Sequence, residues 1–224
     1  HRDLHSFPTR RSSDLIQSVS ALLESAGIVP GDNVAILSNN MPNWAITYFA
    51  ITFMGAVVVP ILPDFSATEV ANVLEHSGVK AIFISAAQKQ KIEGRKSENP
   101  STGFLIDDFS VIFTSGKILQ YNPEAMPVRK YEVTEDDLAS IIYTSGTTGR
   151  SKGVMLTHKN ISFNALKGKI IQPVYETDRF LSVLPLSHTY ENTLGLILPM
   201  LGASCVYYLR KPPTHLYYFL RSKL

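Results

Sequence analysis

The chain has 224 residues, of which 45% are hydrophobic and 18% are charged, and its 21 Lys and Arg against 19 Asp and Glu leave a formal net charge of +2. This composition indicates a folded protein of one or two domains and excludes a disordered or fibrous chain, while so small a net charge argues against general binding of nucleic acid. Because Cys205 is the single cysteine, an intrachain disulfide and a cysteine-based zinc site are excluded, and we expect a reducing cytoplasm.

The opening residues differ in character from the rest of the chain. They contain no apolar core of the kind that a secretory signal needs. The segment HSFPTRRSSDL resembles the in-frame translation of a short-read sequencing adapter. We therefore expect residues 1–15 to be an assembly artefact, and residues 16–224 to be part of a longer reading frame.

Apolar residues then alternate between helical spacing and short continuous runs, a pattern that is typical of βα units around a parallel sheet. It predicts a helix from Ile16 to Ala26, a strand over 34–37, a helix over 42–54, a strand over 57–62, a helix capped by Ser66 and Glu69, and a strand over 81–84. The apolar stretch over 45–62 approaches the length of a membrane span, but Gly55 and Pro60 interrupt it. We favour a buried helix followed by a buried strand.

The second half of the chain continues the same alternation after a polar stretch over 85–103, which we expect to be an exposed connection. The pattern predicts a strand over 104–106, a short helix over 109–113, strands over 138–143 and 153–156, a helix from Thr157 to about 169, a strand over 180–184, a helix over 189–201, a strand over 205–208 and a helix from about 214. The predicted fold class is therefore α/β, with layered βα units around mostly parallel sheets.

The most informative segment is YTSGTTGRSKGV at 143–154, between two predicted strands. Its glycines let the backbone turn tightly and present N–H groups to a polyanion, and its hydroxyls and Lys152 add donors and a positive charge. It is not a Walker A loop, because Ser151 precedes the lysine and Gly153 follows it. A flexible linker is the alternative, but the flanking strands and the ending in Lys-Gly favour a loop that holds a phosphate chain.

The segment YTSGTTGRSKGVMLTHKN resembles the signature phosphate loop of the adenylate-forming superfamily, which contains acyl-CoA synthetases, adenylation domains of nonribosomal peptide synthetases, and luciferases. The segments GDNVAILSNNMPNWAITYFAITFMGAVVVPI and LEHSGVKAIFIS look like parts of the family's large N-terminal domain. LPLSHTYENTLGLILPMLGASCVYY resembles its second conserved segment, in the form typical of long-chain fatty acid CoA ligases. The resemblance implies a truncated N-terminal AMP-binding domain over 16–224, without its C-terminal part and without the small C-terminal domain.

The resemblance implies an AMP-forming fatty acid CoA ligase. A carboxylate attacks the α-phosphorus of Mg-ATP to give an acyl-adenylate and pyrophosphate, and the thiol of CoA then displaces AMP. The implied cofactors are ATP and Mg²⁺, with CoA as co-substrate, and the implied partners are small molecules in the cytoplasm, with peripheral membrane association left open. Two alternatives remain: an adenylation domain that loads an amino or aryl acid onto a carrier protein, and a non-catalytic nucleotide-binding remnant. We expect the fragment alone to be inactive and poorly soluble.

The resemblance also implies roles for individual residues. Lys152 and His188 would be the catalytic residues, with Lys152 on the phosphate chain and His188 beside the carboxylate and the α-phosphate. Thr144 would lie near Mg²⁺. The groups that bind the nucleotide would be Thr144, Ser145, Gly146, Thr147, Thr148, Gly149, Lys152, Gly153 and Glu191.

Structural alternatives stand beside several of these roles. His188 could be a histidine that only begins a helix, and Glu191 could be a first-turn carboxylate stabilised by the helix dipole rather than a group at the mouth of the pocket. Tyr190 could line the acyl tunnel or pack in the core. Cys205 lies in an apolar run and is expected to be a core residue rather than a nucleophile.

Overall fold

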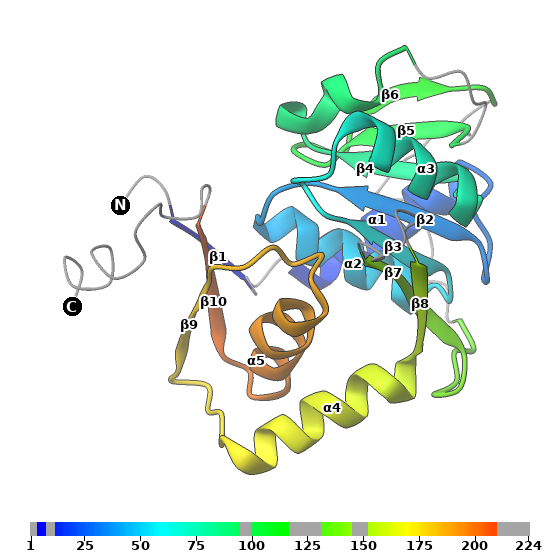
Figure 1. Ribbon diagram of the computed structural model, residues 1–224. Helices are drawn as coiled ribbons and strands as arrows, with labels where there is room; N and C mark the ends of the chain where they lie inside the picture. The colour runs from blue at the N-terminus through cyan, green and yellow to red at the C-terminus, as the bar shows by residue number, and fades with distance from the viewer. Residues whose placement is uncertain (1–3, 8–11, 95–99, 117–130, 145–151, 210–224) are drawn as a thin grey trace.

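The computed structural model describes residues 4–7, 12–94, 100–116, 131–144 and 152–209. Within them, a seven-stranded sheet lies beside a smaller three-stranded sheet (Figure 1). The strands of the large sheet are β2 (Asn33–Leu37), β3 (Val57–Ile61), β4 (Ala81–Ile84), β5 (Thr102–Leu105), β6 (Val111–Thr114), β7 (Leu138–Thr144) and β8 (Lys152–Thr157). Those of the small sheet are β1 (Leu4–Phe7), β9 (Arg179–Ser182) and β10 (Cys205–Leu209).

Helices separate most of these strands along the chain. The α-helices are α1 (Ser12–Ser25), α2 (Pro42–Phe53), α3 (Ala67–Ser77), α4 (His158–Ile171) and α5 (Leu198–Leu201). A 3₁₀-helix, η1 (Ala86–Ile92), follows β4, and a π-helix, η2 (Glu191–Ile197), precedes α5. The alternation of strands with helices confirms the predicted α/β class.

The strand order of the large sheet is β6-β5-β4-β2-β3-β7-β8. The strands from β5 to β7 in this order run parallel to one another, and β6 and β8 lie antiparallel at the two edges. Because parallel strands end at the same side of a sheet, the segments that follow β2, β3, β4 and β7 meet along one edge. In the small sheet, β10 is parallel to β9 and antiparallel to β1.

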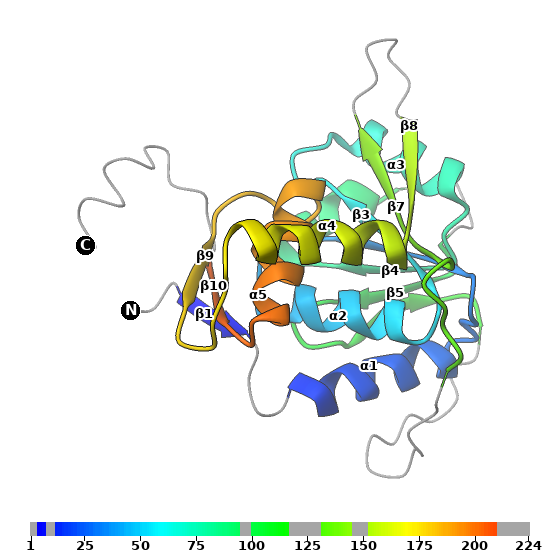
Figure 2. The same ribbon diagram turned by 90° about the horizontal axis from the view of Figure 1, so that it is seen from below.

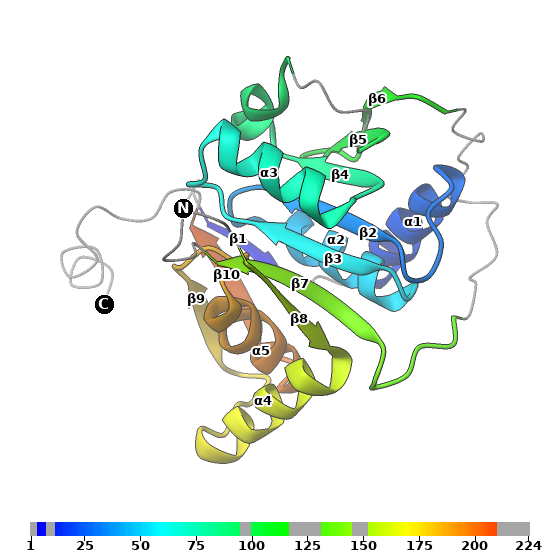
Figure 3. The ribbon, with the colours of Figure 1, turned by 45° about the vertical axis from the view of Figure 1, so that its right-hand side comes forward.

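Both faces of the large sheet are covered, as the central strand β2 illustrates. Val34 and Ile36 pack into the core with α1 and α2, whereas Ala35 and Leu37 pack into the core with α3. Figure 2 shows α1 and α2 on one face, and Figure 3 shows α3 on the other. Since successive side chains of a strand point to opposite faces, a strand buried on both faces is a continuous apolar run rather than an alternating one.

The predicted helix starts at Ser66 and Thr157 are confirmed. The Ser66 hydroxyl accepts a hydrogen bond from the backbone N–H of Glu69, and the Glu69 carboxylate accepts one from the backbone N–H of Ser66. Thr157 and Asn160 form the same reciprocal pair at the start of α4. These bonds satisfy backbone donors that have no partner within the helix.

The prediction of a buried helix and strand over 45–62 is confirmed by α2 and β3. Most of α2 is buried, including Trp44 and Tyr48, and β3 is buried along its whole length. Burial raises the pKa of the Tyr48 hydroxyl far above its ordinary value. In the described part of the chain, no helix combines the length and the hydrophobicity that crossing a bilayer requires.

Two predicted elements are wrong. Residues 109–113 do not form a helix, because the chain turns back after β5 and 111–114 pair with it as the edge strand β6. The turn places Phe109 at a φ of 63°, which non-glycine residues rarely adopt, and the Phe113 ring lies over Gly103. The polar stretch over 85–103 is also not wholly exposed, since η1 buries Gln88 and Ile92.

Two further predictions differ in detail or lie outside the described residues. The predicted helix over 189–201 is helical throughout, but its central turns form the π-helix η2. The first helix begins at Ser12 rather than near Ile16. The helix predicted from about 214 lies outside the described residues.

Candidate active site

The structure describes both ends of the predicted phosphate loop. Thr144 is the last residue of β7 and Lys152 is the first of β8, and the two face each other as an antiparallel pair. Both residues are exposed. The ladder therefore holds the two ends of the 145–151 connection at a fixed separation.

The next pair down this ladder is Tyr143 with Gly153. A Cβ at Gly153 would lie 2.9 Å from Cγ2 of Ile141 and 3.2 Å from Cζ of Tyr143. The Tyr143 ring is buried, with 3% of its surface exposed. Glycine at 153 thus lets β8 lie directly on the tyrosine that supports the end of β7.

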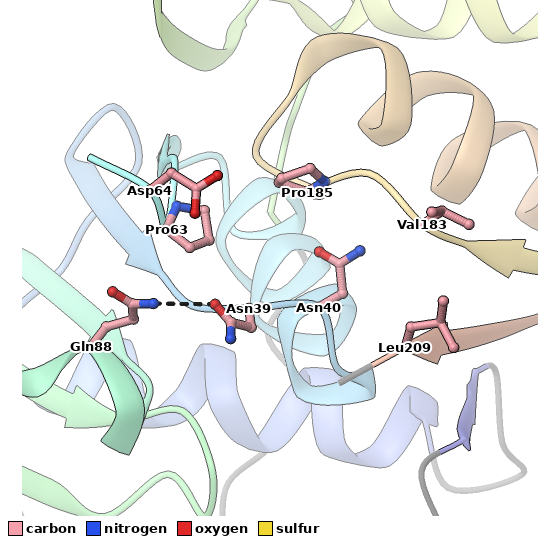
Figure 4. Close-up of a pocket in the computed structure, with 8 residues that line it drawn as sticks. All are labelled: Asn39, Asn40, Pro63, Asp64, Gln88, Val183, Pro185 and Leu209. Carbon is pink, nitrogen blue, oxygen red and sulfur yellow. Dashed lines mark hydrogen bonds between the residues drawn. The ribbon is translucent and has the colours of Figure 1, made fainter. Parts of the chain in front are cut away.

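The segments that follow the parallel strands border a cavity of about 180 Å³ (Figure 4). The large sheet contributes residues that follow β2, β3 and β4, and the small sheet contributes residues at the ends of β9 and β10. The lining residues are Asn39, Asn40, Pro63, Asp64, Gln88, Val183, Pro185 and Leu209. Parallel α/β sheets bind their ligands at this edge, which is also the edge where β7 ends at Thr144.

His188 lies on the segment between β9 and η2. Its backbone N–H donates to the carbonyl of Pro185 at 2.8 Å, and its carbonyl accepts from the N–H of Asn192 at 2.9 Å. Its Nδ1 accepts a hydrogen bond from the backbone N–H of Tyr190 at 3.3 Å. In the neutral ring, this bond places the proton on Nε2, so the exposed side chain can offer a donor to an oxygen.

Glu191 lies inward from His188 and is only 7% exposed. Its carboxylate lies near the Ser182 hydroxyl and the backbone at Val183 and Leu184. Burial raises the pKa of Glu191, although these polar groups and nearby His188 act in the opposite direction. The carboxylate therefore faces the end of β9, and its assignment to nucleotide binding stays a prediction.

Sequence reasoning missed Asn40, which lies between β2 and α2. The Asn40 side chain hydrogen-bonds to the segment that leads to His188. A polar residue shortly after a buried strand was the available signal, but its partners lie too far along the chain for the signal to identify them. Tyr190 is 59% exposed and Cys205 is partly buried within β10.

A profile of the AMP-binding enzyme family matches residues 10–221. This chain belongs to the AMP-binding enzyme family. Long chain acyl-CoA synthetase 6, peroxisomal, of Arabidopsis thaliana is 32% identical to it over 195 residues, which are 81% of this chain and 28% of that protein. The 2-succinylbenzoate–CoA ligase of Bacillus licheniformis is 34% identical over 167 residues, which are 74% of this chain and 32% of that protein.

The fold is likewise that of the family. The N-terminal domain of FACL13 from Mycobacterium tuberculosis superposes with a TM-score of 0.74 at 23% identity, over 90% of this chain and 49% of that chain. The resemblance to adenylate-forming enzymes and the fold class are therefore confirmed. The chain spans about a third of the length of these two relatives. The activity and the substrate of the full-length protein are therefore proposals.

Only part of the implied nucleotide and metal site lies in the described residues. The loop residues Ser145, Gly146, Thr147, Thr148 and Gly149 lie outside the described residues, so their roles stay predictions. No group of three or more His, Cys, Asp or Glu suited to a metal occurs in the described part of the chain. The exposed Thr144 offers a hydroxyl oxygen as a ligand. This fits Mg²⁺, which usually binds one or two protein ligands together with phosphate oxygens.

Proposed function

We propose that this chain is the N-terminal part of an AMP-forming acid–CoA ligase, and that its acid is a fatty acid. The observation that carries the proposal is that the paired loop ends Thr144 and Lys152 lie at the same edge of the parallel sheet as Asn40, which holds the segment that leads to His188. Family membership supports the adenylating reaction. The form of the LPLSHTYENT segment supports the fatty acid.

The chemistry requires two anions, a carboxylate and a triphosphate, to be brought together while charge moves onto pyrophosphate. The Lys152 ammonium, on a backbone held by its pairing with Thr144, would bind the phosphate chain. The Nε2 proton of His188 would orient the carboxylate or the α-phosphate. Mg²⁺, when bound, neutralises phosphate charge, and the Thr144 hydroxyl would hold it.

Lys152→Ala in the full-length protein tests the nucleotide site. Because a donor aimed at developing charge contributes about 3 to 4 kcal/mol, we expect ATP–pyrophosphate exchange to fall about a hundredfold or more. Lys167→Ala, on the exposed surface of α4, is the matched control and should retain exchange. Unchanged exchange in Lys152→Ala contradicts the assignment.

An aryl acid is the second candidate substrate, because one relative is named for 2-succinylbenzoate. Acid-dependent AMP release by the full-length protein, measured with palmitate, benzoate and free amino acids, separates the candidates. Preference for palmitate supports the fatty acid. Preference for benzoate, or thioester formation only on a carrier protein, supports the alternatives, and no AMP release with any acid supports a non-catalytic remnant.

We also propose that residues 1–15 are not native and that 16–224 belong to a longer reading frame. The sequence of the intact genomic locus tests both points. A native codon run that matches residues 1–15 would contradict the first, and a stop codon directly after Leu224 would contradict the second.

A further inference from the structure

Asn40 connects the two sheets through a single amide side chain. Its Nδ2 donates to the Ser182 hydroxyl at 3.0 Å and to the Leu184 carbonyl at 2.6 Å, and its Oδ1 accepts from the Leu186 N–H at 2.8 Å. These partners lie 142 to 146 residues further along the chain. Asn40 is 9% exposed, so its amide has little access to water as an alternative partner.

The Glu191 carboxylate lies close to the segment that Asn40 contacts, near the Ser182 hydroxyl and the backbone at Val183 and Leu184. The Asn40 amide satisfies the Leu184 carbonyl and the Leu186 N–H, two backbone groups that lie in no strand or helix. A Cβ on Gly195 would lie 2.5 Å from Oε1 of Glu191, so the absence of a side chain at Gly195 leaves the space that the carboxylate occupies.

The held segment leads directly to His188. The His188 N–H bonds to the carbonyl of Pro185, which lies between the two Asn40 contacts at Leu184 and Leu186. Asn40 itself follows the buried strand β2, at the edge where the phosphate loop begins. Figure 4 shows the Asn40 side chain directed toward the stretch between Val183 and Pro185.

We propose that Asn40 is a positioning residue which fixes the 182–186 segment to the carboxyl edge of the parallel sheet and thereby sets the place of His188 relative to Thr144 and Lys152. The expected effect of Asn40 on catalysis rests on the proposed function. The claim that Asn40 orders the 182–186 segment does not depend on which reaction the protein catalyses.

Asn43 provides a matched control. Its Nδ2 donates to the backbone carbonyls of Ile106 at 2.8 Å and Asp107 at 2.9 Å, so Asn43→Ala also removes side chain–backbone hydrogen bonds near the start of α2. Those bonds hold the end of β5 and not the His188 segment. Comparing Asn40→Ala with Asn43→Ala therefore separates positioning of His188 from loss of hydrogen bonds in general.

The first measurement is amide hydrogen exchange in the full-length protein, which needs no activity. We expect Asn40→Ala to speed exchange in peptides covering 183–188, where Leu186 loses its acceptor, and Asn43→Ala to leave these peptides unchanged. Unchanged exchange over 183–188 in folded Asn40→Ala, or equal acceleration in both variants, overturns the proposal. If Asn40→Ala does not fold, Asn40→Leu, which fills a similar volume but has neither donor nor acceptor, is measured in its place with the same two outcomes.

The second measurement is acid activation by the same variants. Since misplacement of a reacting group by about 1 Å can cost about a hundredfold, we expect Asn40→Ala to lower kcat about ten- to a hundredfold, with the KM for ATP changed less than about twofold. Asn43→Ala should stay within about twofold of the wild type. If acid activation by Asn40→Ala matches that of Asn43→Ala in an active wild-type background, the positioning role is wrong.

A double-mutant cycle distinguishes action through His188 from a merely structural effect. We expect Asn40→Ala to have little further effect on kcat in a His188→Ala background, because the group that it places is gone. Additive losses overturn the proposal. A wild-type protein without any acid activation would refute the proposed function, while the hydrogen-exchange comparison would still decide whether Asn40 holds the segment.

Discussion

The Nδ1 atom of His76 lies 2.6 Å from the hydroxyl oxygen of Tyr143, and the two rings meet edge to face with centroids 5.7 Å apart. His76 belongs to the last turn of α3, whereas Tyr143 directly precedes Thr144 at the start of the phosphate loop. The pair therefore connects a helix on one face of the sheet to the strand that presents the loop.

Tyr143→Phe should weaken this connection. The substitution removes one partly buried hydrogen bond, and we expect the free energy of unfolding to fall by about 1 kcal/mol, measured by urea denaturation of the full-length protein. We also expect the KM for ATP to rise, because the residue before Thr144 loses its anchor. Tyr175→Phe, at a site that is 63% exposed, is the control. If both variants lose the same free energy of unfolding, the hydroxyl of Tyr143 contributes no more to stability than an exposed hydroxyl does.

Gly153→Ala tests the close contact between β8 and Tyr143. The added Cβ would approach the side chains of Ile141 and Tyr143 at 2.9 Å and 3.2 Å, so these side chains or the strands that carry them have to shift. We expect ATP–pyrophosphate exchange to fall about tenfold, because Lys152 lies next to this position on the same strand.

The control for this variant is Gly116→Ala, at an exposed glycine where an added Cβ would meet no atom within 4 Å. It should leave exchange unchanged. A Gly153→Ala variant with wild-type exchange would show that the end of β8 adapts without moving the lysine.

Glu191→Gln should change the pH dependence of stability. Burial raises the pKa of Glu191 above the ordinary value of 4.5, so between these two pKa values the folded protein binds more protons than the unfolded chain. Protonated Glu191 thus contributes stability that is complete below the ordinary value and is lost as the pH rises through the raised value. Glutamine is neutral at every pH, and we expect the variant to lose less stability than the wild type over this range.

Thermal midpoints of the full-length protein, recorded from about pH 4 to about pH 8, measure this difference. His188 and Tyr208 lie near the carboxylate, so His188→Ala is measured alongside to separate the contribution of this neighbour from that of Glu191. Glu176→Gln, at an exposed loop position, should follow the wild type. Parallel curves for wild type and Glu191→Gln would contradict a raised pKa.

Most of the strands and helices around the site could be predicted because each is a local pattern. The continuous apolar runs at 34–37 and 81–84 are short and bounded by turn residues, and burial on both faces of the sheet requires that pattern. The reciprocal bonds at Ser66 and Thr157 involve residues only three positions apart, so their spacing is visible in the sequence.

The elements that could not be predicted depend on contacts with distant partners or on an unusual backbone conformation. The strand β6 exists because it pairs with β5 through a turn that contains Phe109 in the left-handed region. The π-helix η2 has the same apolar pattern as an α-helix. It differs in its backbone hydrogen bonds, such as the one from the N–H of Leu198 to the carbonyl of Thr193, five residues earlier.

The sequence by itself determined the alternation of strands and helices, the position of the glycine-rich loop between β7 and β8, and the family, because each depends on residue types at short spacings. Only the tertiary structure decided that Asn40 hydrogen-bonds to the segment before His188 and that His76 contacts Tyr143. These contacts join residues up to 146 positions apart, and the one between His76 and Tyr143 spans 67. No local pattern records such a pairing, because it arises only when the crossing of βα units brings the ends of separate strands to one edge.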